Sequence, residues 1–452
     1  MSDPIPLSAL DLARAIASGR TDARDATEAF IAEIEAGDPD AHVFYVRTFA
    51  RARAEAAAAH DRATRGLPRS LLDGVPLSWK DLFDSGGDEC RAGSAMLAGR
   101  TPTRDALALR RLGAGGTVCL GKTAMTELAF SGLGINPVLG TPANPHDTAT
   151  ARVPGGSSSG AGASLARGMC AAAMGTDTGG SVRIPAAWNG VVGFKPSHGT
   201  IPLDGVVPLC PSLDTIGPLT RNVADAAAIW SLLTGHADPL ASHLRLSDSR
   251  LLVPDAIVFD ECDPGIAETV QAALAAIARA GAEITHADLP ALARMNALTW
   301  ERGLSLPAVE AWSIWQETIA ARGELMYPPV RKRFEGGAAP TAAEARTLVR
   351  ERKIIRGDFI EAMAGFDAVA LPAIPIDPPP IDALTDGGPA YDRANRLALR
   401  NTTLGNQLDL CAITLPCGTS RAGLPVGLML MAPKGHDARL LQLARAVEAV
   451  LS

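Results

Sequence analysis

The chain of 452 residues lacks the features that mark several large classes of protein. Only six of its 42 basic residues are lysines, no block of Lys and Arg occurs, and the net charge is −7, so we expect no nucleic-acid surface. No apolar run approaches the ~18 residues needed to span a bilayer, which argues against a membrane protein. The first twenty residues have an amphipathic helical pattern with charges inside it, so we expect no signal peptide.

Cysteine and histidine are sparse and scattered. The seven cysteines form no CxxC pair and are odd in number, which predicts free thiols and a cytoplasmic location. The eight histidines form no HxxxH or HxxE pattern, so the sequence supports neither a metal site nor a metal cofactor.

The remaining composition is that of an ordinary globular chain, with 47% hydrophobic and 20% charged residues. Residues 8–66 have helical periodicity, and Ser8 is the expected N-cap of the first helix. From about residue 70, short apolar runs broken by glycine alternate with helical segments, which predicts buried strands. We therefore expect an α/β fold in which a mixed, twisted central sheet is flanked by helices on both faces.

These changes in sequence pattern along the chain predict a single domain, residues 1–452, made of four parts. Strands are expected at 251–259 and 282–285, with a helix at 266–280 between them and mostly helices over 290–365. The expected parts are N-terminal helices (1–66), the core (67–235), a variable covering region (236–370) and a C-terminal part that completes the core (371–452).

Two motifs match catalytic patterns but lack the structural context that the chemistry requires. Residues 116–123, GTVCLGKT, fit the P-loop pattern, yet the four variable positions resemble a strand rather than a turning phosphate loop. GSSSG, with Ser158 at its centre, fits the nucleophile elbow GxSxG, but the polar residues before it do not predict the buried strand that an elbow needs. We expect neither a nucleotide site nor an elbow-type hydrolase.

A third set of residues has a consistent chemical explanation: two serine-bearing loops and one lysine. VPGGSSSGAGA contains Ser157, GTDTGGSVRIPAA contains Ser181, and the apolar residues of DGVPLSWKDLFD predict a strand that carries Lys80 into the interior. A serine hydroxyl is a poor nucleophile until a base takes its proton, and a lysine whose pKa burial lowers can be that base. The small residues before Ser181 allow backbone N–H groups to converge into an oxyanion hole.

These segments, in order with GKTAMTELAFSG, GVVPLCPSLDTIGPLTRNVADAA and LPCGTSRAGLPVGLMLMAP, resemble the amidase signature family of serine hydrolases over nearly the whole chain. The resemblance implies a triad of Ser181 as nucleophile, Ser157 as bridging serine and Lys80 as base, with a cis peptide before Ser157. Ser158 and Ser159 are expected to make hydrogen bonds to backbone in the turn. The resemblance further implies oxyanion donors at the backbone N–H groups of Thr178, Gly179, Gly180 and Ser181, and loop bracing by Gly156, Asp177 and Arg183.

The implied reaction is a two-step acyl transfer that needs no cofactor. Neutral Lys80 takes a proton from Ser157, Ser157 takes one from Ser181, and Ser181 attacks the carbonyl carbon. The relay then protonates the leaving nitrogen, and water hydrolyses the acyl-enzyme.

The substrate is less constrained than the mechanism. We expect hydrolysis of a small or aryl amide, with two alternatives: a carbamate hydrolase using the same triad, or the glutaminase-type subunit of a transfer-RNA amidotransferase. A catalytically silent scaffold is disfavoured by the intact triad, and similar enzymes suggest a homodimer. The aromatic residues of 300–327 either line an acyl pocket or pack helices onto the sheet. The candidate pocket residues are Met125, Ser131, Trp312, Trp315 and Tyr327.

Overall fold

Eleven strands form one sheet in the computed structural model, which describes residues 8–452. The strands are β1 (Phe44–Arg47), β2 (Pro76–Lys80), β3 (Val118–Thr123), β4 (Ala172–Asp177), β5 (Val192–Lys195), β6 (Thr215–Thr220), β7 (Arg250–Pro254), β8 (Glu283–Ala287), β9 (Ala368–Pro372), β10 (Leu410–Thr419) and β11 (Pro425–Pro433).

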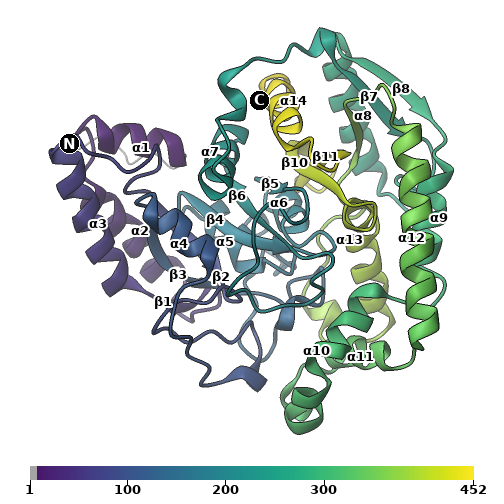
Figure 1. The fold of residues 1–452 in the computed structure, drawn as a ribbon, viewed down its shortest axis with the longest axis horizontal. Coiled ribbons are helices and arrows are strands. Elements are labelled where there is room, and N and C mark those ends of the chain that lie inside the picture. The colour runs from purple at the N-terminus through teal and green to yellow at the C-terminus, as the bar shows by residue number, and fades with distance from the viewer. Residues whose placement is uncertain (1–7) are drawn as a thin grey trace.

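The α-helices surround this sheet (Figure 1). They are α1 (Ala9–Ala17), α2 (Ala23–Gly37), α3 (Phe49–Thr64), α4 (Leu107–Ala114), α5 (Ser159–Ala166), α6 (Arg183–Trp188), α7 (Val223–Thr234), α8 (Pro264–Arg279), α9 (Pro290–Trp300), α10 (Leu306–Arg322), α11 (Pro328–Glu335), α12 (Ala342–Ala362), α13 (Pro389–Gln407) and α14 (Asp437–Leu451).

The sheet is mixed, with strand order β1-β3-β2-β4-β6-β5-β10-β11-β9-β7-β8. The neighbours β3, β2 and β4 are parallel, as are β9, β7 and β8 at the other end, whereas the strands from β4 to β9 pair antiparallel. Figure 1 places α1–α3 at one end of the sheet and α9–α12 at the other. The predicted mixed α/β architecture is confirmed.

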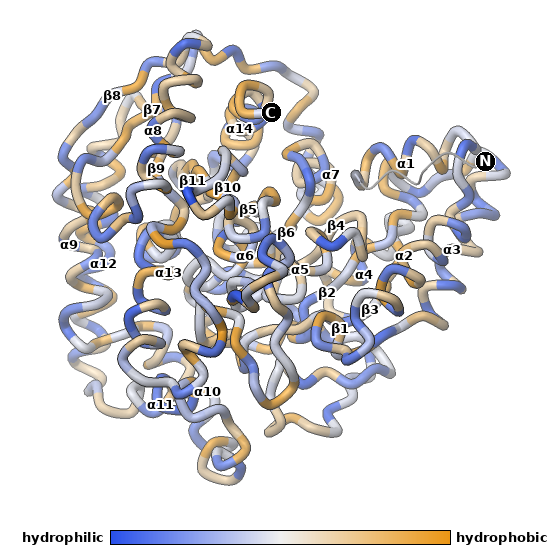
Figure 2. The backbone as a smooth tube through the Cα atoms, turned by 180° about the vertical axis from the view of Figure 1, so that it is seen from behind, coloured by the Kyte–Doolittle hydropathy of each residue, from blue (hydrophilic) through white to orange (hydrophobic). Residues whose placement is uncertain are grey.

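Alternation along the central strands builds an apolar core on each face. In β10, Cys411 and Ile413 pack in the core that includes α7, α8 and α14, whereas Leu410 and Ala412 belong to the core that includes α6 and α13. This follows from the two-residue period of a strand, which turns successive side chains to opposite faces. The outer helix α12 is instead a mixture of hydrophilic and hydrophobic residues (Figure 2). Among the described helices, none combines the length and apolar character needed to cross a membrane.

The N-terminal part departs from its prediction in two ways. Strand β1 interrupts the helices and pairs antiparallel with β3, but four residues are too few to stand out from helical periodicity. Ser8 begins α1 without capping it through its own side chain. Asp225 of α7 instead accepts from the N–H groups of Ala9 and Leu10, each at 2.9 Å. The part of the predicted amphipathic pattern over residues 1–7 lies outside the described residues.

The segment expected to cover the core also extends the sheet. Within residues 236–370, β7 and β8 form its outer edge, and the strand expected over 251–259 ends at Pro254. The remainder of this segment is helical, as expected, and its helices α9–α11 form one wall of the cavity described below. The four-part division of the domain stays a prediction.

Candidate active site

Neither the P-loop pattern at 116–123 nor the GxSxG pattern around Ser158 has the structural context that its chemistry requires. Residues 118–123 are strand β3, paired on both sides, so no phosphate loop exists there. Before Ser158 the chain contains an isolated bridge at Arg152 but no strand, which excludes a nucleophile elbow.

Lys80 is the last residue of β2 and is completely buried. Its Nζ donates to the Oγ of Ser157 at 2.7 Å and to the Oγ1 of Thr176 at 2.9 Å. Burial lowers the pKa of Lys80 to about 7, even though the carboxylates of Asp214 and Asp177 act in the opposite direction. A large fraction of such a lysine is neutral near pH 7, so its lone pair can accept a proton from Ser157.

Ser157 lies in the loop before α5, where its position is set by backbone contacts. The Gly156–Ser157 peptide is cis, as the resemblance implied. The carbonyl of Ser157 accepts from the N–H of Thr126 at 3.0 Å, and the N–H of Gly156 donates to the carbonyl of Gly132 at 2.8 Å. A Cβ atom on Gly156 would lie 2.5 Å from the backbone nitrogen of Gly134, so this position accepts only glycine.

The other two serines of the triplet differ from one another. The N–H of Ser158 donates to the carbonyl of Ser181 at 3.3 Å, and its hydroxyl donates to the carbonyl of Thr176 at 3.3 Å. The Oγ of Ser159 is buried and makes no hydrogen bond with any described residue, so the expected turn contact is wrong for Ser159 alone. Through these contacts the loop of Ser157 and the loop of Ser181 are directly joined, and Lys80 is bonded to the first.

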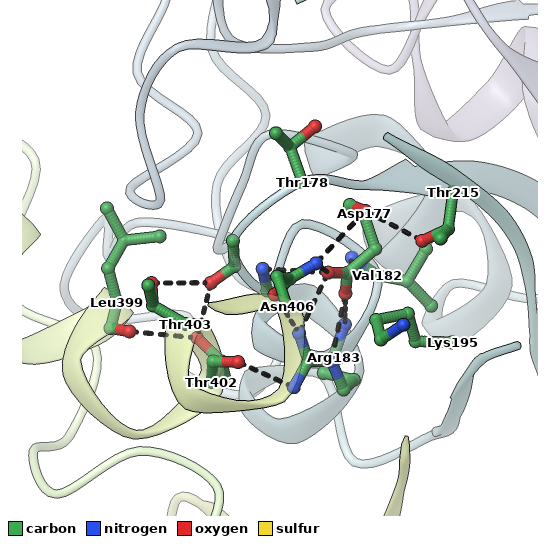
Figure 3. A network of polar contacts seen from close by, with 12 residues as sticks. Asp177, Thr178, Val182, Arg183, Lys195, Thr215, Leu399, Thr402, Thr403 and Asn406 are labelled. Atoms are coloured by element: carbon green, nitrogen blue, oxygen red, sulfur yellow. Dashed lines mark hydrogen bonds and ion pairs between the residues drawn. The ribbon is translucent and has the colours of Figure 1, made fainter. Parts of the chain in front are cut away.

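A buried ion pair holds the loop between β4 and α6 (Figure 3). The Nη2 of Arg183 lies 2.8 Å from the Oδ1 of Asp177, and its Nε lies 3.0 Å from the Oδ2. Burial by itself would raise the pKa of Asp177, but the guanidinium outweighs it and holds that pKa at about 2. Asn406 of α13 bonds both partners, donating to Asp177 at 2.9 Å and accepting from Arg183 at 2.7 Å.

The peptide between Gly179 and Gly180 has no free hydrogen-bonding group, so its N–H is not available to an oxyanion. The N–H of Gly180 donates to Asp177 at 2.9 Å, and the carbonyl of Gly179 accepts from the hydroxyls of Thr402 at 2.8 Å and Thr403 at 3.1 Å. Gly180 is therefore not placed as the oxyanion donor that the resemblance implied. Within residues 8–452 nothing accepts from the N–H groups of Thr178, Gly179 and Ser181, so these three can face a ligand.

Ser181 and Thr178 border a cavity of about 280 Å³. The hydroxyl of Thr178 donates to buried Asp214, which fixes that side of the opening. The opposite side is made by α9, α11 and the segment between α9 and α10. The lining is mainly apolar, with a few polar groups, as in small-molecule sites generally. It includes Phe130, Trp300, Leu304, Arg333, Leu399 and Gln407.

Of the five predicted pocket residues, Ser131 lines this cavity and the other four do not. Met125 is fully buried in the core. Trp315 donates its Nε1 hydrogen to the carbonyl of Pro208 at 3.0 Å, and Trp312 packs beside the core. The ring of Tyr327 meets the ring of Tyr391 edge-on. Trp312, Trp315 and Tyr327 therefore join helices to the body of the protein, which is the second interpretation that the sequence allowed, whereas Trp300 lines the cavity, as the first interpretation expected.

Sequence reasoning missed three side chains that contribute to this region. Arg333 of α11 lines the cavity, but its place in the charged run VRKRF is typical of a solvated helix face. The hydroxyls of Thr402 and Thr403 reach the serine-bearing loop from α13, 223 and 224 residues away in sequence. No local pattern identifies such a contact.

Comparison with known proteins shows what this chain is similar to. The Amidase family model matches residues 25–441. A 2-amino-5-chloromuconic acid deaminase of Comamonas testosteroni is 36% identical, over 89% of this chain and 87% of that protein. One component of the glutamyl-tRNA(Gln) amidotransferase of Anaeromyxobacter sp. (strain K) is 36% identical over 96% and 94%.

Solved structures agree over almost the full length. The crystal structure of an amidase superposes with a TM-score of 0.89 at 32% identity, covering 98% of this chain and all of that one. A 6-aminohexanoate cyclic dimer hydrolase superposes with a TM-score of 0.86 at 25% identity, covering 99% and 98%. The chain belongs to the amidase signature family, whose members act on C–N bonds other than peptide bonds.

Proposed function

We propose that the chain hydrolyses a C–N amide bond in a small molecule through a covalent acyl-enzyme on Ser181. The observation that carries this proposal is the 2.7 Å contact between Lys80 and Ser157, made by a buried lysine with a pKa of about 7. Ser181 lies on the adjoining loop and borders the cavity. A nucleophile with an activating base beside a ligand-sized cavity is the arrangement that acyl transfer requires.

In the first half-reaction, Lys80 accepts the hydroxyl proton of Ser157 as Ser157 accepts that of Ser181. The Oγ of Ser181 forms a bond to the substrate carbonyl carbon, and the free N–H groups of Thr178, Gly179 and Ser181 are the donors to the resulting oxyanion. The relay returns a proton to the nitrogen as the C–N bond breaks, so a neutral amine or ammonia leaves. Water then attacks the ester through the same relay, which releases a carboxylic acid and restores Ser181.

The comparisons support two substrate classes. The deaminase of C. testosteroni acts on 2-amino-5-chloromuconic acid, a small molecule, and a cavity of about 280 Å³ is of a size for such molecules. The second candidate is a glutaminase-type subunit of a transfer-RNA amidotransferase, supported by 36% identity to a component of such an enzyme over 96% of the chain. Carbamates present the same reacting carbonyl and would be attacked in the same way.

A substrate panel tests the proposal. We expect turnover of at least one of a set of primary amides, anilides and aryl carbamates, labelling of Ser181 by a fluorophosphonate, and loss of both in Ser181→Ala. Turnover that survives in Ser181→Ala would refute the mechanism. Copurification with two further chains would favour the amidotransferase subunit.

Two further parts of the proposal concern the protein's setting. All seven cysteines are free in the structure, which supports a cytoplasmic location. A homodimer stays a prediction that light scattering on the purified protein can test.

A further inference from the structure

Arg333 is a half-buried cation that the residues of the range 8–452 leave without an ion-pair partner. It lines the cavity that Ser181 borders, and its guanidinium carbon lies 4.6 Å from the ring centre of Phe130, another lining residue. Its Nε has no accessible surface and no hydrogen-bond partner. The side chain of Arg333 forms no ion pair or hydrogen bond with any residue in the range 8–452. An arginine keeps its charge in proteins, so an unpaired guanidinium that has lost part of its hydration is stabilised when a ligand supplies the anion.

The basic residues beside Arg333 do not share this property. On the same helix, Arg331 pairs with Glu335 at 2.7 Å, and Lys332 lies 3.9 Å from Asp392 on the surface. Burial lowers the pKa of Arg333 and outweighs the opposing influence of Tyr391 and of the Asp392 carboxylate.

The cavity as a whole favours negative charge. Its lining, all within the described part of the chain, contains Lys332 and Arg333 but no aspartate or glutamate. The buried carboxylate of Asp214, which contacts the lining residue Thr178, already accepts from that hydroxyl and from the N–H groups of Leu209 and Cys210. A ligand ammonium group would therefore find cations and apolar side chains but no free carboxylate.

We infer, on the basis of the proposed function, that the substrate is a small amide that also carries a carboxylate and no ammonium group, such as the monoamide of a short dicarboxylic acid. Its carboxylate forms a bidentate pair with Arg333 while its amide carbonyl meets Ser181. Paired N–H donors in a plane match a carboxylate in both charge and shape. Hydrolysis adds water across the C–N bond, so a dicarboxylic monoamide yields the dicarboxylate and ammonium.

The same charge pattern separates this substrate from glutamine. Glutamine has the side-chain amide and the carboxylate, but its α-ammonium group would enter a cavity lined by cations. The inference thus favours a free-standing acid-amide hydrolase over the glutaminase-type subunit.

Three closely related amides test the substrate class. Glutaramate has the amide and the carboxylate, butyramide lacks the carboxylate, and L-glutamine adds an ammonium group. We expect kcat/KM for glutaramate to exceed the other two by roughly 10- to 100-fold, the range for one charged hydrogen-bonded contact. Succinamate and adipamate vary the distance between amide and carboxylate, so the preferred length is found in the same assay. If the best acid amide is no better than butyramide, or if glutamine equals it, the inference is wrong.

Variants of Arg333 test the residue. Arg333→Gln should abolish the preference for the acid amide while leaving kcat/KM for butyramide within a few-fold, which a misfolded protein could not do. Arg333→Lys should restore part of the preference, because an ammonium group keeps the charge but not the paired donors. Arg331→Gln, on the exposed side of the same helix, is the control and should behave as the wild type. An unchanged preference in Arg333→Gln would overturn the assignment.

A binding measurement keeps this result separate from the catalytic proposal. Calorimetric titration of glutaramate into Ser181→Ala should show binding that Arg333→Gln weakens by roughly 10- to 100-fold. If Ser181 resists fluorophosphonate while this Arg333-dependent binding persists, the proposed mechanism fails and the binding site stands. If Ser181 is labelled and neutral amides turn over but glutaramate binding does not depend on Arg333, the mechanism stands and the inference fails.

Discussion

Two arginines, Arg183 and Arg333, have very different surroundings in two neighbouring regions of this molecule. Arg183 is the first residue of α6. Its guanidinium bonds Asp177 of β4 and, from α13, Asn406 and the carbonyl of Thr402. Arg333, on the cavity wall formed by α11, has an aromatic ring and no acceptor. The first region is complete without a ligand and acts as a scaffold, whereas the second contains a charge that no described residue pairs. Substitutions in the scaffold should therefore change activity toward all substrates. Substitutions in the cavity wall should change the preference for one substrate over another.

The largest expected effect is the loss of the nucleophile. Ser181→Ala should lower kcat for every substrate by roughly 10⁴-fold or more, as in other serine hydrolases that lose the attacking hydroxyl. Ser159→Ala is the matched control, because that buried hydroxyl has no hydrogen-bond partner among the described residues, and it should retain full activity. Steady-state assays of the two variants against the same substrate suffice. A comparable loss of activity in both variants would show that Ser181 is not the nucleophile.

Loss of the base, Lys80, should have the second-largest effect on activity. The pH dependence of the reaction should identify this residue. Lys80→Met should lower kcat/KM by roughly 10²- to 10⁴-fold, the range for general-base catalysis. In the wild type, protonation removes the lone pair that accepts the Ser157 proton, so kcat/KM should fall as pH drops through about 7, the pKa of buried Lys80. A pH–rate profile between pH 5 and 9, with folding checked by circular dichroism, measures this. A flat profile across neutrality would exclude Lys80 as the base.

Replacement of each arginine by methionine compares the two regions directly through stability. Arg183→Met leaves Asp177 buried without its cation, so the free energy of unfolding should fall by about 3–5 kcal/mol. Arg333→Met leaves no carboxylate behind, so it should change that free energy by less than about 1 kcal/mol or increase it. Urea denaturation at pH 7 compares both variants with the wild type. Equal destabilisation would mean that Arg333 has a partner after all.

The sequence predicted the parts of this molecule that depend on local composition. Glycine-punctuated apolar runs identified the mixed sheet, and the residues around Lys80, Ser157 and Ser181 identified segments that the structure joins by hydrogen bonds. Strand β1 was missed because its four residues pair only with a distant segment, β3.

The missed features of the site share one physical cause: each depends on contacts between segments far apart in the chain. Nothing in GTDTGGS shows that the N–H of Gly180 turns to Asp177 while two threonines of α13 hold the carbonyl of Gly179. Likewise VRKRF contains three consecutive cations, and only the packing of α11 decides that Arg333 lines the cavity without an ion-pair partner. The aromatic residues before α11 were ambiguous because a tryptophan in a helix pattern suits a pocket and a helix contact equally well.

The smallest predicted effect concerns α13, the helix that serves both regions. Thr403 borders the cavity, yet its hydroxyl donates to the carbonyl of Gly179 in the scaffold loop. Thr403→Val keeps the shape and removes that hydrogen bond, worth about 1 kcal/mol, so kcat should fall roughly 5-fold as the loop is held less firmly. Thr299→Val is the matched control, because that cavity threonine donates only within its own helix, to Met295 at 2.7 Å. If Thr403 acts through the loop, an acid amide and a neutral amide will lose the same factor. Unequal factors would instead assign Thr403 to the wall that selects the substrate.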